Sequence, residues 1–154
     1  ARALGTTPVQ SERRERAVWS TGVVGTLLVG AAGLIVGALL PWATVDAVLF
    51  SATANGIDGD GVITLIVGGI VAIFVALLRG RRGVAAACLL LGLLAGVVAL
   101  VDLVNVSSRV GDVQSTANLA LKASVGVGLW LTALAAVAVV VGSVGAFVQS
   151  RQQR

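Results

Sequence analysis

The stretch GVITLIVGGIVAIFVALLRGRRGVAAACLLLGLLAGVVAL (residues 61–100) decides the fold class. It holds two long apolar runs with the basic segment RGRRG between them. A helix needs about 20 residues to cross the hydrocarbon core of a bilayer, and each run is close to that length. Because only about four residues remain for the connection, the runs predict two membrane-spanning helices in a tight antiparallel hairpin.

Two further apolar runs flank this pair, and the composition of the chain agrees with a membrane protein. Of the 154 residues, 57% are hydrophobic and 12% are charged, about half the charged fraction of a soluble domain. The predicted fold is therefore an all-α four-helix transmembrane bundle. It forms a single domain over 17–148, with helices at about 17–40, 61–78, 83–106 and 124–148 and cytoplasmic tails at 1–16 and 149–154.

Charge divides the two sides of this bundle. The segments on one side are rich in arginine, whereas the first connection on the other side carries Asp46, Asp58 and Asp60 and no basic residue. The positive-inside rule therefore predicts cytoplasmic N- and C-termini. We expect contacts with anionic lipids at Arg13, Arg14, Arg16, Arg79, Arg81 and Arg82.

The two outer connections are each about twenty residues long, and we expect both to be structured. The first contains WATVDAVLFSATA (residues 42–54), which is typical of a short β-hairpin lying on the bundle. In the second, Val106, Val110, Val113 and Ala117 recur at helical spacing. This pattern predicts a short helix in the membrane interface.

Small residues recur at four-residue spacing in all the spans. Such positions let helix backbones approach closely in a membrane. Two interpretations stand side by side: packing within one bundle, or docking on partner subunits. The positions concerned are Gly33, Gly37, Gly68, Ala72, Gly92, Gly96 and Gly142.

Three aspartates are the candidate polar sites. Asp58 and Asp60 begin like the D-x-D of a calcium loop, but Val62 stands where the next ligand belongs. They are weak metal candidates, and the alternative is that one of them caps the second helix. Asp102 lies near the outer end of the third helix. At that depth it is either a functional site or the partner of Arg109 or Lys122 in an interfacial ion pair.

The three tryptophans mark depth. Trp19 and Trp42 bracket the first helix, as residues anchored at the two membrane interfaces do. Trp130 is placed about two turns inside the fourth helix as a packing or lipid-facing residue. The alternative there is a quinone or lipid tail stacked on the indole.

Missing residue types exclude several kinds of chemistry. The chain has no His or Met, and Cys88 is its one cysteine. Haem, zinc, copper and histidine-base sites therefore have no complete set of ligands or bases. Lys122 and Ser124 are two residues apart, a spacing that does not bring a dyad together on a helix. We predict no enzyme activity, no cofactor and no nucleic-acid partner.

Three segments carry a resemblance. Pro41-Trp42 follows the first helix, GIDGDG (residues 56–61) precedes the second, and VGVGLWL (residues 125–131) opens the fourth. With the Ala/Val/Gly/Arg bias, this pattern resembles small uncharacterised four-helix membrane proteins of actinobacteria. Proteins of this size also occur there as accessory subunits of respiratory supercomplexes, so the resemblance implies a partner and no activity of its own.

The sequence and the resemblance together favour a multi-pass, non-catalytic accessory subunit of a larger complex in a bacterial plasma membrane, with other membrane-protein subunits as partners and a respiratory complex as one candidate. The first alternative is a small oligomeric transporter or channel-like protein. The second is a membrane protein that handles lipid or quinone.

Overall fold

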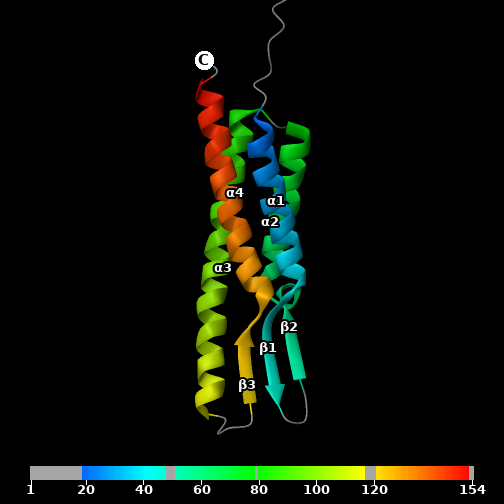
Figure 1. Ribbon diagram of the computed structural model, residues 1–154, viewed down its shortest axis with the longest axis vertical. Helices are drawn as coiled ribbons and strands as arrows, with labels where there is room; N and C mark the ends of the chain where they lie inside the picture. Colours follow the sequence, from blue (N-terminus) through cyan, green and yellow to red (C-terminus); the bar gives the residue numbers. More distant parts are fainter. Residues whose placement is uncertain (1–18, 48–50, 79, 117–120, 153–154) are drawn as a thin grey trace, which may run out of the picture.

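The computed structural model describes residues 19–47, 51–78, 80–116 and 121–152 (Figure 1). These residues form four α-helices, three β-strands and one 3₁₀ turn. In chain order the elements are α1 (Thr21–Leu39), β1 (Pro41–Ala47), β2 (Ser51–Asn55), the 3₁₀ turn η1 (Gly56–Asp58), α2 (Gly61–Leu78), α3 (Arg82–Thr116), β3 (Leu121–Val125) and α4 (Val127–Gln152). All four helices are long and apolar enough to cross a membrane, which confirms the expected number of spans within the described residues.

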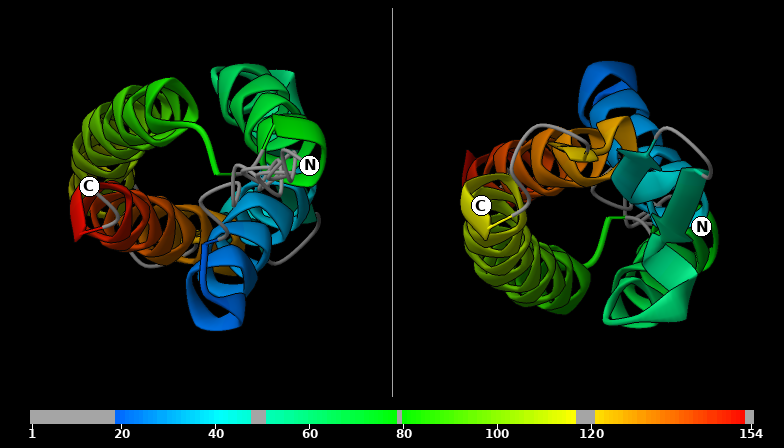
Figure 2. Two further views of the ribbon diagram at one scale, coloured as in Figure 1. Left: turned by 90° about the horizontal axis from the view of Figure 1, so that it is seen from above. Right: turned by 90° about the horizontal axis from the view of Figure 1, so that it is seen from below.

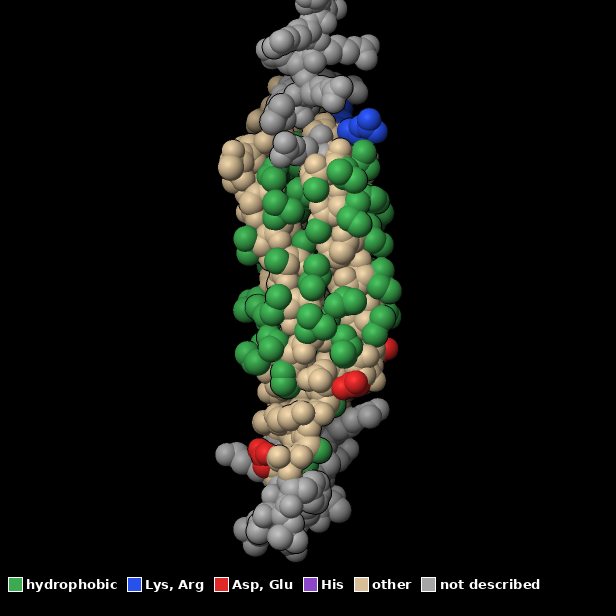
Figure 3. Space-filling view, turned by 90° about the vertical axis from the view of Figure 1, so that its right-hand side faces the viewer, with side chains coloured by type: hydrophobic (Ala, Val, Ile, Leu, Met, Phe, Trp, Pro, Cys, Tyr) green, Lys and Arg blue, Asp and Glu red, His purple; other side chains and the backbone are tan. Residues whose placement is uncertain are grey.

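The two ends of the bundle differ in structure and in charge. At one end, here called the arginine end, α1 begins, α4 ends, and a short connection joins α2 to α3 (Figure 1). The three strands lie at the opposite end, here called the sheet end. On the face in Figure 3, basic side chains gather at the arginine end and acidic ones toward the sheet end, with hydrophobic side chains between. The tail expected at 1–16, including Arg13, Arg14 and Arg16, falls outside the described residues, as does Arg79.

The order of helices around the bundle is α2, α1, α4, α3 (Figure 2). α1 packs most extensively against α4, while α2 and α3 share the fewest contacts of these neighbours. The predicted antiparallel α2–α3 hairpin is present with a connection as short as expected, but its two helices pack less extensively than the other neighbouring pairs. The left-handed backbone of Gly80 (φ 90°) lets the chain turn sharply there. Beyond the turn, α2 packs mainly against α1 and α3 packs mainly against α4.

Glycines explain why α1 and α4 come so close. A Cβ added to Gly30 would lie 3.0 Å from the Val139 nitrogen and 3.1 Å from the Ala135 oxygen. In the same way, Gly37 faces the backbone of Gly128 and Thr132. Backbones that pack at this distance leave no room for a side chain. We call the set that makes this contact the glycine seam; its members are Gly30, Gly33, Gly37, Gly128 and Gly142.

The two long connections meet in one antiparallel sheet with the strand order β2-β1-β3. The predicted hairpin is present as β1 and β2, with Thr44 opposite Thr53. The third strand was not predicted: β3 pairs with β1 on the other side, and Ser124 lies opposite Thr44. The Gly126 N–H also donates to the Trp42 carbonyl at 2.7 Å, which fixes the start of α4 against the start of β1.

Two predicted boundaries need correction. The separate interfacial helix does not form, because α3 continues without a break to Thr116 and extends beside β3. The fourth helix starts at Val127, later than the predicted 124, because 121–125 belong to the sheet. It also continues to Gln152, through most of the segment 149–154 that was expected to be a tail.

Candidate functional site

An apolar groove runs along α3 and α4 and has a volume of about 350 Å³. Its rim is open to the surroundings, since Val97, Leu100 and Val137 are each more than half exposed. The lining residues are Gly92, Leu93, Gly96, Val97, Leu100, Ala133, Ala136, Val137 and Val140. We call this feature the α3–α4 groove.

The predicted small-residue positions divide between the interior and this groove. Gly33, Gly37 and Gly142 belong to the glycine seam, and Gly68 packs on α1, where an added Cβ would lie 2.9 Å from the Ala31 oxygen. Ala72 is partly buried beside the core. The space at Gly92 is also filled, since an added Cβ there would lie 2.9 Å from the Val139 side chain. At Gly96, by contrast, an added Cβ would meet only the Cβ of Ala136, at 3.9 Å. Gly96 is thus a small residue inside a span that no neighbour fills.

Asp102 is buried within the protein at the sheet end of α3. Only 8% of the residue is exposed, and its Oδ2 atom has no hydrogen-bond partner among the described residues. The carboxyl group of Asp60, just before α2, lies within hydrogen-bonding reach of it. The side chains of Arg109 and Lys122 fall outside the described part of the chain, so the predicted ion pair stays a prediction.

Asp58 and Asp60 point to different tasks. The Asp58 carboxylate accepts a hydrogen bond of 2.9 Å from the backbone N–H of Asn55, and so closes the turn before α2. Asp60 directly precedes α2, and its backbone carbonyl accepts from the Ile63 N–H at 3.0 Å; a side-chain cap on that helix by either aspartate stays a prediction. Among the described residues, no group of three acidic, His or Cys side chains comes together.

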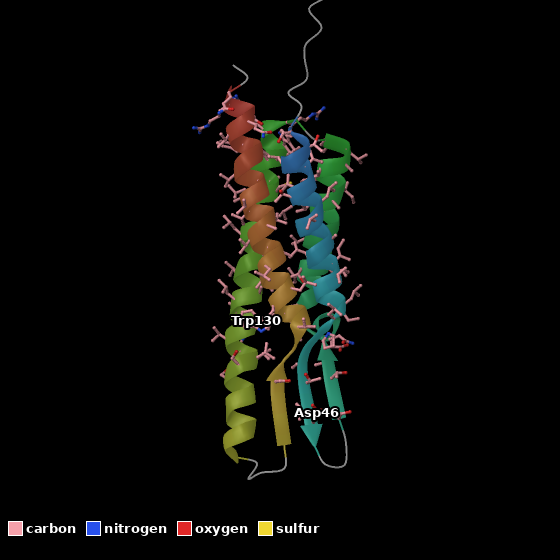
Figure 4. The ribbon with its side chains drawn as sticks, in the orientation of Figure 1. Asp46 and Trp130 are labelled. Carbon is pink, nitrogen blue, oxygen red and sulfur yellow. The ribbon has the colours of Figure 1, made fainter. Side chains whose placement is uncertain are left out.

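The tryptophans occupy three different settings. Trp19 and Trp42 stand at the two ends of α1 as predicted, but both are buried in protein, with 3% and 6% exposed. Trp42 donates from Nε1 to the Gly37 carbonyl at 2.8 Å. Trp130 is 54% exposed and lies in the first turn of α4, toward the sheet (Figure 4). The expected depth of two turns is wrong because α4 starts only three residues earlier.

Side chains from three helices meet at the arginine end. Trp19 Nε1 donates to the Ser150 hydroxyl at 3.3 Å, and Arg82 Nε donates to the Ser150 carbonyl at 2.8 Å. Ser20 caps α1 by accepting from the Val23 N–H, and it also accepts from the Gln149 side chain at 2.8 Å. Arg82, expected to contact lipid, therefore bonds to the last turns of α4, whereas Arg81 is exposed.

The remaining polar groups in the spans are occupied locally. The hydroxyls of Thr64, Thr132 and Ser143 are fully buried. Each donates to a carbonyl of its own helix, three or four residues earlier, at 2.7 to 2.9 Å. Cys88 is fully buried as well. At the sheet, the Ser124 hydroxyl shares a hydrogen bond of 3.1 Å with the Thr44 hydroxyl.

The pairing of Asp60 with Asp102 was missed at the sequence level, although a signal for it existed. Asp60 stands 20 positions before Gly80, in the centre of the α2–α3 connection, and Asp102 stands 22 positions after it. Residues about equally far from the turn of an antiparallel pair lie at about the same depth. This symmetry becomes visible only when the two aspartates are compared with each other across the turn, and not each with its own helix.

These observations define a class: a multi-pass α-helical membrane protein by the length and composition of its helices, with a small sheet at one end. Comparison with models of protein families and with curated proteins gives no match. The function must therefore be argued from the groove, the carboxyl pair and the packing.

Proposed function

We propose that this chain is a non-catalytic accessory subunit of a larger bacterial plasma-membrane complex. In this proposal the α3–α4 groove receives a transmembrane helix of a partner subunit. The observation that carries the proposal is the open position at Gly96, between the exposed side chains of Val97 and Val137.

The groove suits a helix because of its spacing and its chemistry. Gly96 is a small residue on the groove floor that α4 leaves unfilled, and small residues at such positions let a second helix approach closely. The other lining side chains are aliphatic and cannot hold a polar ligand. Tight van der Waals packing is a main source of association energy between helices in lipid, and an unfilled small position offers it.

The buried hydroxyls favour this proposal over the transporter alternative. A transport path needs polar groups that face a shared cavity at membrane depth. The hydroxyls of Thr64, Thr132 and Ser143 are each satisfied within their own helices. The lining of the α3–α4 groove is apolar throughout. Both features belong to a packed scaffold.

The orientation belongs to the same proposal. We place the arginine end in the cytoplasm, since Arg81, Arg82 and Arg151 lie there, and the sheet outside the membrane. Arg81 is exposed and available to anionic lipid headgroups. The resemblance described above makes a respiratory complex of an actinobacterial plasma membrane the first partner to test.

The test is a substitution that fills the groove, with a matched control. Gly96→Leu places an aliphatic side chain in the space that the partner helix would occupy. Gly69→Leu makes the same change on α2 at a span position where an added Cβ meets nothing within 4 Å. Both variants should fold, because neither position contacts the core closely.

The measurement is native mass spectrometry of the tagged chain, extracted from its own membrane in mild detergent. We expect the wild type and Gly69→Leu to leave the membrane in a stoichiometric complex. The amount of partner subunit recovered with Gly96→Leu should fall about tenfold, because one well-packed helix contact contributes about 1–2 kcal/mol to association. Equal recovery of the partner by both variants, or copurification of only lipid or quinone, would contradict the proposal.

A further inference from the structure

The Asp102 carboxyl group is the one polar side chain whose burial is left uncompensated among the described residues. It is more than nine-tenths buried, and Oδ2 lacks a hydrogen-bond partner. A buried carboxylate needs a proton, a hydrogen-bond donor or a positive charge beside it. The group that it faces is another carboxyl, that of Asp60.

Other polar side chains described near the start of α2 are already engaged elsewhere. Asp58, the next acidic residue, already accepts from the Asn55 backbone N–H. The nearest hydroxyl on α2, that of Thr64, donates to the Gly61 carbonyl. No third acidic, His or Cys side chain joins the pair in the described part of the chain. Two carboxylates with neither nitrogen nor sulfur ligands are a donor set for a hard cation.

We propose that Asp60 and Asp102 together bind a hydrated divalent cation of the Mg²⁺, Mn²⁺ or Ca²⁺ class. Two negative charges match the charge of such an ion. One or two carboxylates with several retained waters is a common way for proteins to hold Mg²⁺. The exposed position of Asp60 leaves one side of the site open to water, so the waters have a place.

The position of the site gives the cation a structural task. Asp60 precedes α2 and Asp102 belongs to α3, the two neighbouring helices with the fewest contacts. At the arginine end these helices are tied by their short connection. A cation shared by the two carboxylates ties them at the other end, where like charges would otherwise push them apart.

The experiment uses the whole chain in nanodiscs of zwitterionic lipid, with Mn²⁺ as the probe and electron paramagnetic resonance to count free Mn²⁺. We expect one bound Mn²⁺ per chain with a Kd of about 0.1–1 mM, the range of weak exposed sites built from few ligands. Mg²⁺ and Ca²⁺ should displace it. Asp102→Asn and Asp60→Asn should each weaken binding by about tenfold or more. Asp46→Asn is the matched control, because Asp46 is an exposed aspartate of β1 farther out on the same end (Figure 4).

Thermal unfolding separates a binding role from a folding defect. In a chelator, Asp102→Asn should unfold at a higher temperature than the wild type, because one of two like charges is gone. Saturating Mg²⁺ should raise the unfolding temperature of the wild type and leave that of Asp102→Asn unchanged. A variant that merely misfolds would unfold lower in both conditions.

Three results would overturn the proposal. One is Mn²⁺ binding that Asp102→Asn leaves intact. Another is an equal loss of binding in Asp46→Asn. The third is the absence of Mn²⁺ binding in the wild type; its appearance in Arg109→Gln or Lys122→Gln would then show that a basic side chain holds Asp102 instead.

Discussion

α1 and α4 lie near opposite ends of the chain, yet they form the closest pair in the bundle, whereas α2 and α3, joined by a short connection, share fewer contacts (Figure 2). Connection length therefore does not decide which helices pack. The glycine seam brings the α1 and α4 backbones into contact, and no such set of glycines joins α2 to α3 within the described residues. In a bilayer, where lipid competes equally for apolar side chains, close backbone approach is what distinguishes one neighbour from another.

The largest expected loss of stability comes from a substitution at the sheet end of the α1–α4 pair. Trp42 is buried at the start of β1 and donates to the Gly37 carbonyl in the glycine seam. Its indole also packs on Gly56, so it joins the seam to the turn before α2. Trp42→Ala removes this bond and leaves a large cavity. We expect it to lower the free energy of unfolding by about 3–5 kcal/mol.

Steric trapping in bicelles measures that change, and Trp130→Ala is the control. Trp130 is 54% exposed, so its loss should change the stability by no more than about 0.5 kcal/mol. Equal losses in the two variants would mean that Trp42 does not hold the sheet end of the seam.

A substitution inside the seam tests the contact itself. At Gly37 an added Cβ would meet the side chain of Thr132, its nitrogen at 3.0 Å and the Gly128 oxygen at 3.1 Å. Because two of these are backbone atoms, the helices must separate to admit a side chain. Gly37→Val should therefore cost about 3 kcal/mol, the upper part of the usual range for overpacking.

Gly69→Val is the matched control for this change, because an added Cβ on that face of α2 meets nothing within 4 Å. Cysteine cross-linking between α1 and α4 gives a second readout. Gly37→Val should reduce its yield and Gly69→Val should not. If Gly37→Val kept both its stability and its cross-linking yield, close backbone contact at the glycine seam would not be what holds α1 to α4.

The contrast between the two helix pairs also explains what could be predicted from the sequence. Apolar length located the spans, and α2 has the predicted bounds of 61–78, because a membrane helix is a local property of the chain. The strand β3 was missed because its partner β1 lies about eighty residues earlier and LKASV has no strong strand signal of its own. Likewise, nothing after Val106 breaks α3 before Thr116, so a helix predicted as separate became its continuation.

The candidate site followed the same division. Asp102 stood out at once, because a charge at membrane depth is rare. Its neighbour Asp60 is predicted from the sequence as a weak metal candidate with Asp58 or as a cap on α2, because the sequence does not show that Asp60 and Asp102 face each other. Gly96 was grouped with Gly33 and Gly37 by spacing alone. Only the packing separates a filled glycine from an open one.

The smallest expected loss of stability comes from a substitution at the arginine end, where α3 is bonded to α4. α3 has fewer contacts with α2 than with α4. Arg82 at the start of α3 donates to the Ser150 carbonyl in the last turns of α4, at the negative end of that helix dipole. Arg82→Gln removes the charged donor and should lower the free energy of unfolding by about 1.5–2 kcal/mol. Arg82→Lys should recover only part of this loss, because an ammonium group cannot reproduce the fork of the guanidinium.

Arg81→Gln is the informative control, since Arg81 is the adjacent arginine, carries the same charge and is exposed. If both residues act through lipid, the two variants should lose equal affinity for anionic nanodiscs and show equal stability. If Arg82 serves the protein, Arg82→Gln should lose stability even in zwitterionic lipid, whereas Arg81→Gln should lose only lipid affinity, about 1 kcal/mol per charge. The second pattern would show that α3 is anchored to α4 at the arginine end, which is the attachment that α3 needs if α2 contributes so little to holding it.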